Sequence, residues 1–471
     1  MTPQPPMMPL HEWSGPPGVV TTWRPTAGTR AAARAATPSP VPPSVQQRDH
    51  IRTYLRCEEQ GLAMSRLLTV AWTEPGQCDV IAMTRAIDAH VRRHDTYASR
   101  FVLDHDRIER RVLVDRTEIG FEPVASGEMG WEEWRTSLLA TPGPLEWDCF
   151  GFHVVQHADR FTFCACIDHL VADGSLVAPV FADIHDTYAA LAAGRPQAVE
   201  APSASHLDYC ARQRARLEDL SPQSEEVRAW IEYLRPADPA AIGPLPVGAA
   251  TATTPGALST HWLTDVATID AFEQACVAAG ARLIGGVLGI IALAWTELTG
   301  STTFRAVAPT TTTDDHGGLE FLGWFSGIVP VAIPVGGCTL EETMALAQAT
   351  YSAARRLSGI PPAAVADLVG SDGLPPAAAW SAPLVSFWDA FRQTPGDAVL
   401  RWLAHEGCSM LDAGVSEQVG LWVNRSEAGA SVTVAVPDTP EAHQARDRLV
   451  AGIRTRLEEG ARPFASAAGR R

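Results

Sequence analysis

The chain is poor in basic residues and in long apolar runs. It has 37 Lys and Arg against 54 Asp and Glu, which gives a formal net charge of −17. Nucleic acids and anionic lipid surfaces bind basic protein faces, so this balance argues against both as general partners. The longest apolar run, residues 283–295, is shorter than the roughly 20 residues of a membrane helix. We therefore expect a buried core helix there and no transmembrane segment.

Signatures of several familiar chemistries are also missing. The chain has no Gly-x-Ser-x-Gly elbow and no Walker or dinucleotide-binding glycine pattern. These gaps disfavour a serine hydrolase and an enzyme driven by ATP or NAD. Nine cysteines lack Cys-x-x-Cys spacing, and residues 1–10 lack the basic and apolar regions of a signal peptide. We expect free thiols in a reducing cytoplasm, with no resident cofactor and no metal.

Length and composition indicate a globular fold of two lobes. The 471 residues are 46% hydrophobic and 19% charged, which is enough apolar material for a sizeable core. Pro-rich composition predicts an irregular N-terminal arm at 1–40 and a Pro/Gly/Ala-rich linker at 235–258. The first lobe would span 41–234 and the second 259–471. Both mix helix and strand patterns, which predicts the α+β class with a cleft between the lobes.

Hydrophobic periodicity locates the main elements. Two strands flank a polar turn between Phe150 and His169, and the second strand ends at the histidine. Helical spacing predicts helices, and short apolar runs predict strands. The helices are expected at 78–94, 180–191, 269–280, 281–298 and 440–459, and further strands at 325–335, 383–388 and 432–436.

The sharpest chemical feature is the segment Ile167-Asp168-His169-Leu170-Val171-Ala172-Asp173-Gly174. A histidine at a strand end, where the chain leaves the core, can reach a cleft. Its ordinary pKa of about 6.5 lets the neutral ring accept a proton near pH 7, as a general base for a hydroxyl nucleophile requires. Gly174 permits a tight turn, and nearby N–H groups could face an oxyanion. Taken alone, the pattern fits a hydrogen-bonded histidine and a plain turn equally well.

The context of this segment resembles the condensation-domain and chloramphenicol-acetyltransferase-like superfamily, whose signature is His-His-x-x-x-Asp-Gly. Weaker blocks of the family follow in the same order along residues 41–335. These similar segments are Pro43-Ser44-Val45-Gln46-Gln47, Arg92-Arg93-His94 with Ser99-Arg100-Phe101, Leu207-Asp208-Tyr209-Cys210-Ala211-Arg212-Gln213, Ala229-Trp230-Ile231-Glu232-Tyr233-Leu234 and the floor-loop block Gly323-Trp324-Phe325-Ser326-Gly327-Ile328-Val329-Pro330. The resemblance implies two lobes with mixed sheets around a V-shaped cleft and a catalytic role for His169.

Within the superfamily the chain is similar to the actinobacterial polyketide-associated acyltransferases, in particular mycobacterial members that esterify trehalose. The segments behind this are Val20-Thr21-Thr22-Trp23-Arg24-Pro25, Pro75-Gly76-Gln77-Cys78-Asp79, Arg93-His94-Asp95-Thr96-Tyr97, Trp147-Asp148-Cys149-Phe150 and the Asp168-His169 pair. The resemblance implies transfer of a fatty or polyketide acyl group to a hydroxyl. The donor would be acyl-coenzyme A or a phosphopantetheinyl carrier protein, including that of a polyketide synthase. We expect a monomer, because two lobes already create the cleft, and a lipophilic product suggests action near the inner membrane face.

The chain departs from the family pattern at two positions. Asp168 replaces the first histidine of the signature, and Gly327 replaces an asparagine of the floor loop. Extended neighbours point to opposite faces, which would keep Asp168 away from the reaction. A strand-end geometry would instead let its carboxylate support His169, with a raised histidine pKa as the sign. The family implies that Asp173 is structural and pairs with an arginine, for which Arg93 and Arg305 are both candidates.

Weaker patterns have simpler explanations. His90 and His94 lie one helical turn apart but lack the glutamate of zinc proteases, so we expect a plain helix face. His153 and His157 lie on an expected strand, roughly 13 Å apart, too far for one ion. Cys164 and Cys166 are expected to be buried thiols. Trp324 and Phe325 would line an acyl channel or simply the core. The run at 310–317 is expected to be a mobile loop near the cleft.

Two other functions share some of these features. One is a stand-alone condensation enzyme that joins carrier-bound intermediates as an amide or ester, also with His169. Dependence on a carrier protein and the identity of the acceptor distinguish this enzyme from one that transfers an acyl group to a sugar. The other is a non-catalytic, carrier-binding scaffold, which Asp168 and Gly327 favour. The presence of His169, Asp173 and Gly174 argues against the scaffold.

Overall fold

The structure is a computed structural model that describes residues 4–105, 107–195, 205–235, 244–251, 253–312, 321–370, 382–392, 397–415 and 419–462. Within these ranges, one sheet has seven strands in the order β1-β14-β4-β9-β8-β2-β7. Neighbouring strands are antiparallel except for β1 with β14. The strands are β1 (Met7–Pro9), β14 (Cys408–Leu411), β4 (Leu67–Pro75), β9 (Arg160–Asp168), β8 (Phe150–Gln156), β2 (Gly18–Pro25) and β7 (Phe121–Met129).

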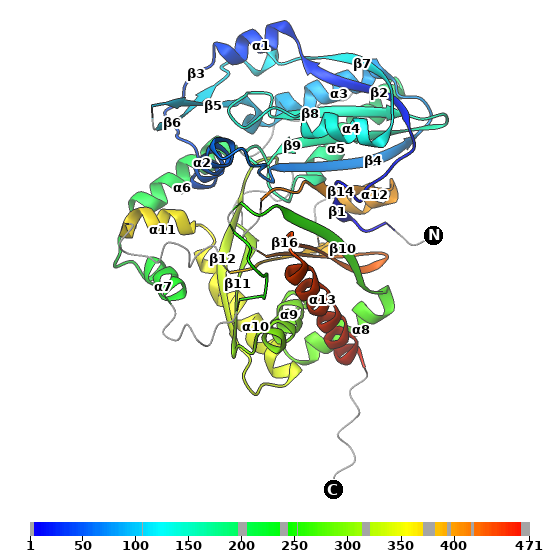
Figure 1. The fold of residues 1–471 in the computed structure, drawn as a ribbon. Coiled ribbons are helices and arrows are strands. Elements are labelled where there is room, and N and C mark those ends of the chain that lie inside the picture. Colours follow the sequence, from blue (N-terminus) through cyan, green and yellow to red (C-terminus); the bar gives the residue numbers. More distant parts are fainter. Residues whose placement is uncertain are drawn as a thin grey trace.

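A second, mixed sheet lies below the first in Figure 1. Among the described residues it has six strands in the order β10-β16-β15-β13-β11-β12, with parallel pairing of β13 to β11 and β15. Its strands are β10 (Gly256–Thr264), β16 (Gly429–Pro437), β15 (Gly420–Ser426), β13 (Leu384–Asp389), β11 (Thr303–Thr311) and β12 (Ser326–Pro334). A small sheet adds β3 (Thr37–Pro38), β6 (Arg107–Val112) and β5 (Ser99–Asp104).

Helices cover both large sheets, and each sheet has its own apolar core. The first lobe carries α1 (Ala27–Arg34), α2 (Val45–Glu59), α3 (Val80–Arg93), α4 (Trp131–Leu139), α5 (Val177–Ala192) and α6 (His206–Glu218). Helix α7 (Glu225–Leu234) packs against β11 of the second lobe, although residues up to 234 were expected in the first. The second carries α8 (Val266–Ala278), α9 (Leu283–Thr299), α10 (Leu340–Ala354), α11 (Pro362–Val369) and α13 (Pro440–Ala461). Short 3-10 turns are η1 (Asp95–Ala98), η2 (Arg116–Glu118), η4 (Arg355–Leu357) and η6 (Ala390–Arg392).

Strand β9 carries the chain from the core to the predicted site. Its side chains alternate between two apolar clusters, as the sequence pattern predicts. Phe161, Phe163 and Ile167 join the main core, whereas Cys164 and Cys166 pack on the opposite face. Because both faces are covered, the register of β9 against β4 is strongly fixed, and the position of His169 is fixed with it.

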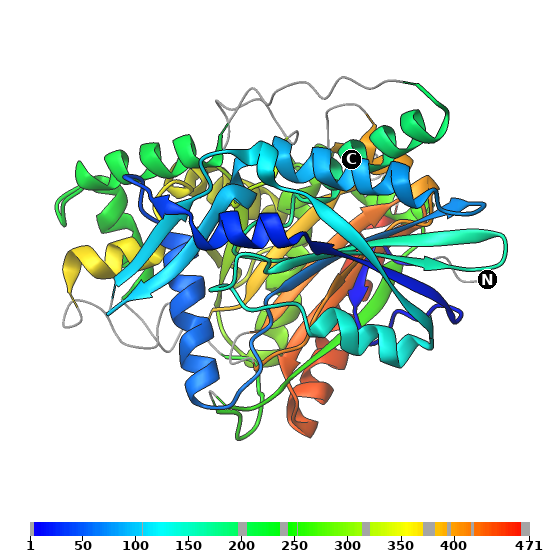
Figure 2. The ribbon, with the colours of Figure 1, turned by 90° about the horizontal axis from the view of Figure 1, so that it is seen from above.

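The α+β class with mixed sheets is confirmed, but the prediction of an irregular arm at 1–40 is wrong. Strands β1 and β2 and helix α1 lie within this segment. Figure 2 shows β2, in dark blue, running along β7, in cyan. Val20 and Trp23 are buried in the core on this strand. The Pro-rich composition hid a strand whose partners, β7 and β8, lie far along the sequence.

The second lobe is not continuous along residues 259–471, in contrast to the prediction. Helix α12 (Ala398–Ala404) and strand β14 lie on the first lobe, where β14 pairs with β4 and β1 (Figure 1). Trp402 is buried there, and its Nε1 donates to the carbonyl of Ala71 at 3.0 Å. We call residues 397–412 the crossover segment. It ties the two halves of the chain together and brings His405 beside β4.

The predicted linker extends too far, because residues 256–258 belong to β10, whereas the apolar run forms the buried helix α9 as expected. Residues 244–251 and 253–255 contain neither helix nor strand, and β10 begins at Gly256. Among the described residues no single helix is long and apolar enough to cross a membrane, although α8 and α9 together, bent by 97°, have the required length and composition. Helix α9 is buried in the second core. All nine cysteines are free, and Cys164 and Cys166 are buried, as expected.

Candidate active site

His169 directly follows β9 and lies at the junction of the lobes. Its backbone N–H donates to the carbonyl of Arg66 at 2.7 Å, which extends the β4–β9 pairing by one residue. The residue is partly exposed, while its Nδ1 is buried and has no hydrogen-bond partner among the described residues. The strand end therefore holds the imidazole at the edge of the core, in a residue that is partly exposed.

Trp324 brings the second lobe onto this imidazole. The ring centroids of His169 and Trp324 lie 4.0 Å apart, with the planes inclined at 37°. The same indole meets His50 edge to face at 5.6 Å. Trp324 is partly exposed, so it covers one side of the histidine without sealing it from solvent. Of the floor-loop candidates, Trp324 is the one whose ring contacts His169.

The surroundings favour the neutral form of His169. Burial lowers its pKa from the ordinary value of 6.5, and nearby His50 lowers it further. Its own backbone and the carboxylates of Asp173 and Asp168 act in the opposite direction but do not prevail. The raised pKa that direct support from Asp168 would produce is therefore absent. A lowered pKa keeps the imidazole neutral at pH 7 and able to accept a proton.

Asp168 is fully buried and belongs to a different network. Its Oδ1 accepts from Nε2 of His50 at 2.7 Å and from the N–H of Leu170 at 2.9 Å, and its Oδ2 pairs with Nη1 of Arg66 at 2.7 Å. Burial acts to raise the pKa of Asp168, but His50 and Arg66 outweigh it and hold the pKa below its usual value. The carboxylate therefore anchors α2 and the start of β4 behind the motif, consistent with side chains 168 and 169 facing opposite sides.

The sequence gives no direct signal for His50 and Arg66. They lie 118 and 102 residues from Asp168 along the chain. His50 is on α2, one turn beyond the Ser-x-x-Gln block. Only that block's place at the start of the same helix could have pointed to it. Arg66 also donates to the carbonyls of Thr141 and Pro142, at 2.5 and 3.0 Å, so its guanidinium is held from several sides.

Asp173 is buried and binds backbone, not an arginine. Its Oδ2 accepts from the N–H groups of Phe325 and Ser326 at 2.9 and 2.7 Å. Its Oδ1 accepts from the N–H and Oγ of Ser175 at 2.9 and 2.5 Å, and its own N–H donates to the carbonyl of Gly323 at 3.2 Å. The motif loop and the floor loop are thus held together by one carboxylate.

Neither arginine proposed as the partner of Asp173 has that role. Arg93 pairs with Asp183. Arg305 donates to the carbonyl of Tyr233 and lies over the ring of that residue, with 4.2 Å from its Cζ to the ring centroid. The expectation of an arginine is therefore wrong for this chain, because the backbone amides of the floor loop supply the positive dipoles that a guanidinium would provide.

Gly327, which departs from the family pattern, and Gly174 of the motif have different surroundings. A Cβ at Gly327 would lie 1.9 Å from the carbonyl oxygen of Ser358, so an asparagine would not fit in this backbone. Gly174 is exposed, and a Cβ there would meet no atom within 4 Å. Its φ is not in the left-handed region, so the fold does not require a glycine for the turn. Neither packing nor φ therefore requires a glycine at position 174.

The remaining floor-loop candidates face the first lobe. Phe325 is buried and meets the rings of His206 and Tyr209 on α6, each at 5.3 Å. A Cβ at Gly323 would lie 2.6 Å from the Phe325 ring. These two residues fill the interface between the lobes and do not reach His169. Thr312 Oγ1 donates to the carbonyl of Phe325, and the rest of the run at 313–317 lies outside the described residues.

The Ser-x-x-Gln block contacts both loops. Ser44 caps α2 in a capping box with Gln47, whose Nε2 donates to the carbonyl of Leu170 at 3.0 Å. Gln46 donates to the carbonyl of Ser326 at 3.3 Å and accepts from Gln213 of α6 at 2.8 Å. Two of the weak family blocks, around Ser44 and Gln213, therefore support the motif loop and the floor loop.

His90 on α3 and His94 at its C-terminal cap are buried and hydrogen-bonded, not part of the plain helix face that we expected. Nε2 of His94 contacts Asp183 at 2.7 Å, and its Nδ1 accepts from the N–H of Leu322 at 3.2 Å. Burial acts to raise the pKa of Asp183, but hydrogen bonds from His90 and His94 hold it well below its usual value. Because Leu322 precedes Trp324, this cluster positions the floor loop from the far side. His153 and His157 bond to different groups, Thr22 and Pro17.

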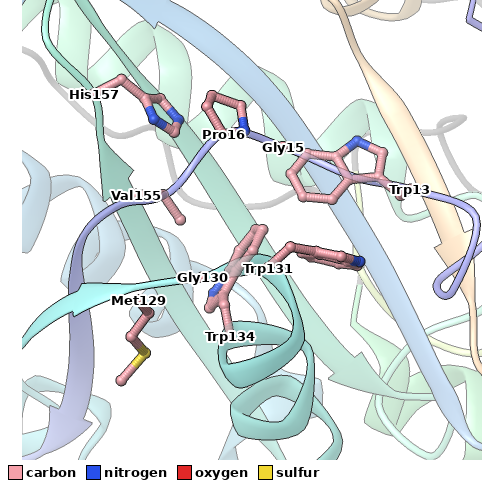
Figure 3. A pocket seen from close by; sticks show the side chains of 9 residues that line it. All are labelled: Trp13, Gly15, Pro16, Met129, Gly130, Trp131, Trp134, Val155 and His157. Carbon is pink, nitrogen blue, oxygen red and sulfur yellow. The ribbon is translucent and has the colours of Figure 1, made fainter.

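An aromatic hollow lies away from this site (Figure 3). It is lined in part by Trp13, Trp131 and Trp134, with ring centroids 4.7 to 5.3 Å apart. Val155 and His157 also line it, at the end of β8 that is remote from His169. Because the sheet separates it from the motif loop, the hollow is not part of the proposed reaction site.

Several known acyltransferases are similar to this chain over nearly its full length. Acyltransferase PapA3 of Mycobacterium tuberculosis is 35% identical over 454 residues, 95% of this chain and 94% of the relative. Trehalose-2-sulfate acyltransferase PapA2 of Mycobacterium bovis is 37% identical over 452 residues, 95% of each chain. The 2'-acyl-2-O-sulfo-trehalose (hydroxy)phthioceranyltransferase PapA1 of Mycobacterium tuberculosis is 37% identical over 460 residues, 95% of this chain and 87% of the relative. No family model matches.

Solved structures give the same picture. The structure of PapA2 acyl transferase superposes with a TM-score of 0.89 at 35% identity and covers 97% of this chain and 100% of that one. The condensation domain of the Monacolin K polyketide synthase MokA has a TM-score of 0.66 at 16% identity, with 89% and 97% covered. At that identity the second comparison bears on the fold alone.

Proposed function

This chain belongs to the PapA family of acyltransferases, and from that membership we propose that it transfers a fatty or polyketide acyl group from a thioester to a hydroxyl of a sugar such as trehalose. The identity of 35–37% with PapA1, PapA2 and PapA3 over nearly the full chain is the observation that carries the proposal. The names of PapA1 and PapA2 place their acceptors among trehalose derivatives. Trehalose and its 2-sulfate are therefore the first acceptors to test.

His169 is the proposed general base. Its neutral imidazole takes the proton of the acceptor hydroxyl while the oxygen attacks the thioester carbonyl. The tetrahedral intermediate then collapses, the C–S bond breaks, and the thiolate takes the proton back from the imidazolium. The lowered pKa of His169 and its position at the partly exposed junction of the lobes support this role. The reaction needs no resident cofactor, because the thioester stores the energy.

The donor is proposed to be acyl-coenzyme A or a phosphopantetheinyl carrier protein. Both present a thioester at the end of the same flexible arm. The exposed position of Gly174, with open space where a side chain would be, supports close approach of such an arm to the motif loop. Direct comparison of the two donors with one acceptor distinguishes them.

Mass spectrometry of the products tests the proposal. The purified chain is incubated with long-chain acyl-coenzyme A and either trehalose or trehalose-2-sulfate, beside His169→Ala. We expect an acylated sugar whose rate of formation falls about 10²- to 10⁴-fold in the variant. His157→Ala, at the far end of β8, serves as the matched histidine control. Turnover that persists in His169→Ala would contradict the role of the base, and product only from carrier-bound amines would favour a condensation enzyme.

A further inference from the structure

A second group of titratable side chains lies on the first lobe, away from His169. It consists of Glu74 near the end of β4, His185 on α5 and His405 in the crossover segment. Glu74 lies near the end of β4 opposite to Leu67, which pairs with Asp168. At about 3.3 Å per strand residue, the group is therefore roughly 20 Å from the proposed base. The proposed reaction makes no use of these residues.

The ligand atoms of the three side chains converge. Glu74 Oε1 lies 3.1 Å from Nδ1 of His185 and 3.5 Å from Nδ1 of His405, and all three ligand atoms lie within 4.8 Å of one another. Zinc binds histidine nitrogen and carboxylate oxygen at about 2.0–2.2 Å in a tetrahedron, whose edges are then about 3.3–3.6 Å. The carboxylate-to-imidazole distances in the structure match those edges with little movement of the side chains.

The charges around the group also fit a cation. Glu74 is buried, and among the described residues its ion-pair partners are His185 and His405, with no arginine beside the carboxylate. The nearby arginines have other partners, since Arg401 binds Asp186 with two hydrogen bonds and Arg160 pairs with Glu406.

Solvent can reach the group. The His405 side chain is 30% exposed, and those of His185 and Glu74 are 13% and 11% exposed. A divalent ion could therefore enter without unfolding the lobe, and water could complete the coordination. The carbonyl of Thr73, 3.2 Å from Nδ1 of His405, is the competing partner of that nitrogen when no ion is bound.

In the other group of histidines and a carboxylate, His90, His94 and Asp183, the ligand atoms already have other partners. There Arg93 already pairs with the carboxylate, Nδ1 of His94 accepts a backbone hydrogen bond from Leu322, and Nε2 of His90 contacts Tyr97 at 3.1 Å. A metal ion would meet a guanidinium at that site. Around Glu74, no arginine of the described residues pairs with the carboxylate, and Arg401, the guanidinium that acts on His185, is bound to Asp186 instead.

We propose that Glu74, His185 and His405 bind a divalent transition-metal ion of the zinc type, with water in the remaining position. Two imidazoles and one carboxylate suit ions of intermediate softness. The ion would join β4, α5 and the crossover segment, so its role is to hold α12 and β14 on the first lobe (Figure 1). This metal site goes beyond the proposed function, because the proposed acyl transfer takes place at the other end of the sheet.

Metal binding to the full-length, tag-free chain tests the site. After dialysis against a chelator, titration with ZnCl₂ by calorimetry should give one equivalent per chain, and Co²⁺ should produce visible absorption bands of a tetrahedral site. His185→Ala and His405→Ala should each weaken binding at least tenfold, whereas His443→Ala, a surface histidine paired with Asp438 at 3.1 Å, should not. Zn²⁺ should raise the melting temperature of the parent chain and leave that of His405→Ala unchanged.

Two further measurements keep the outcome clear. Glu74→Gln keeps the size of the side chain and removes its charge, so weaker binding in a variant of unchanged circular dichroism supports ligation even where an alanine variant fails to fold. Basal acyl transfer should stay the same in Glu74→Gln, which separates this site from the reaction site. No binding by the parent chain, or equal affinity in His185→Ala and His405→Ala, would overturn the proposal.

Discussion

The imidazole of His169 lies against the indole of Trp324, with ring centroids 4.0 Å apart, although the two residues belong to different lobes. The first lobe supplies the proposed base and the second supplies part of its surroundings. Burial is the largest cause of the lowered pKa of His169. The protonation of the base is therefore coupled to the contact between the lobes, and this coupling can be measured.

The pH dependence of turnover should report the contact. We expect the acid limb of kcat/KM to have an apparent pKa below the 6.5 of an ordinary histidine, because the neutral base is the active form. Trp324→Ala uncovers the ring, so the limb should move up toward 6.5, while Trp324→Phe should keep it low. An unchanged limb in Trp324→Ala would show that the indole does not contribute to the environment of the base.

The local part of the site could be predicted from sequence, and the distant part could not. The strand that ends at His169 and the following Asp173 and Gly174 lie in one short segment, so periodicity and motif place them together. Asp168 acquires its partners from α2 and from the residue before β4, 118 and 102 positions away. No spacing rule connects such residues. From the sequence alone, Asp168 is therefore only the loss of a family histidine. The structure shows that the aspartate instead pairs with His50 and Arg66.

The errors have related causes. A four-residue strand such as β14 shows no periodicity, and a Pro-rich segment such as 1–40 hides β2, because both acquire their structure from pairing with distant strands. The arginine expected beside Asp173 is replaced by the amides of Phe325 and Ser326. Backbone groups carry no signature in the sequence, so a side chain that binds them cannot be assigned its partner in advance.

Removal of the Asp168 charge should destabilise the fold. Asp168→Asn leaves the guanidinium of Arg66, whose side chain is 11% exposed, without its carboxylate. Breaking a largely buried pair in this way typically costs about 3–5 kcal/mol, measured here by urea denaturation at pH 7. Arg30→Gln, at a surface pair with Glu122, is the control and should change stability by less than about 1 kcal/mol.

The stability lost in Asp168→Asn should also depend on pH. The pKa of Asp168 is lowered in the folded chain, so its contribution is fully present above the unfolded value of about 3.9 and is lost as pH falls through the folded pKa. The stability difference between parent and Asp168→Asn should therefore be constant from neutral pH to about 5 and shrink below 4. A difference that grows in acid would contradict the direction of the shift.

Asp173 should act as a positioning residue. Asp173→Ala leaves the N–H groups of Phe325 and Ser326 without their acceptor, at a typical cost of about 1–3 kcal/mol for each buried donor. Because the Asp173 carboxylate acts to raise the pKa of His169, its removal should also move the acid limb of kcat/KM further below 6.5, which simple loss of stability would not cause. Ser175→Ala removes only the hydroxyl bond to the other carboxylate oxygen and is the matched control.

Gly174 should matter for turnover and not for folding. Its φ suits any residue, and a Cβ would meet no atom within 4 Å. Gly174→Ala should thus leave the melting temperature unchanged or raise it slightly. The usual gain in the free energy of unfolding for such a replacement is about 0.4–1 kcal/mol. If the donor arm passes close to this backbone, kcat/KM for acyl-coenzyme A should fall at least tenfold. Full activity in Gly174→Ala would remove the argument for close approach at this point.

Gly327 should show the opposite behaviour, and here the family pattern is a misleading guide. Gly327→Asn restores the residue found at this place in the superfamily signature, but its Cβ would lie 1.9 Å from the carbonyl oxygen of Ser358 and 3.1 Å from Cγ2 of Thr312. Such overpacking costs about 1–3 kcal/mol or more, and thermal melting should record it. Gly336→Asn, where the nearest atom is 3.6 Å away, should change stability by less than about 0.5 kcal/mol. If Gly327→Asn instead gained both stability and activity, the backbone of residue 358 would have to lie elsewhere, and the missing amide would be a loss of transition-state stabilisation rather than a consequence of packing.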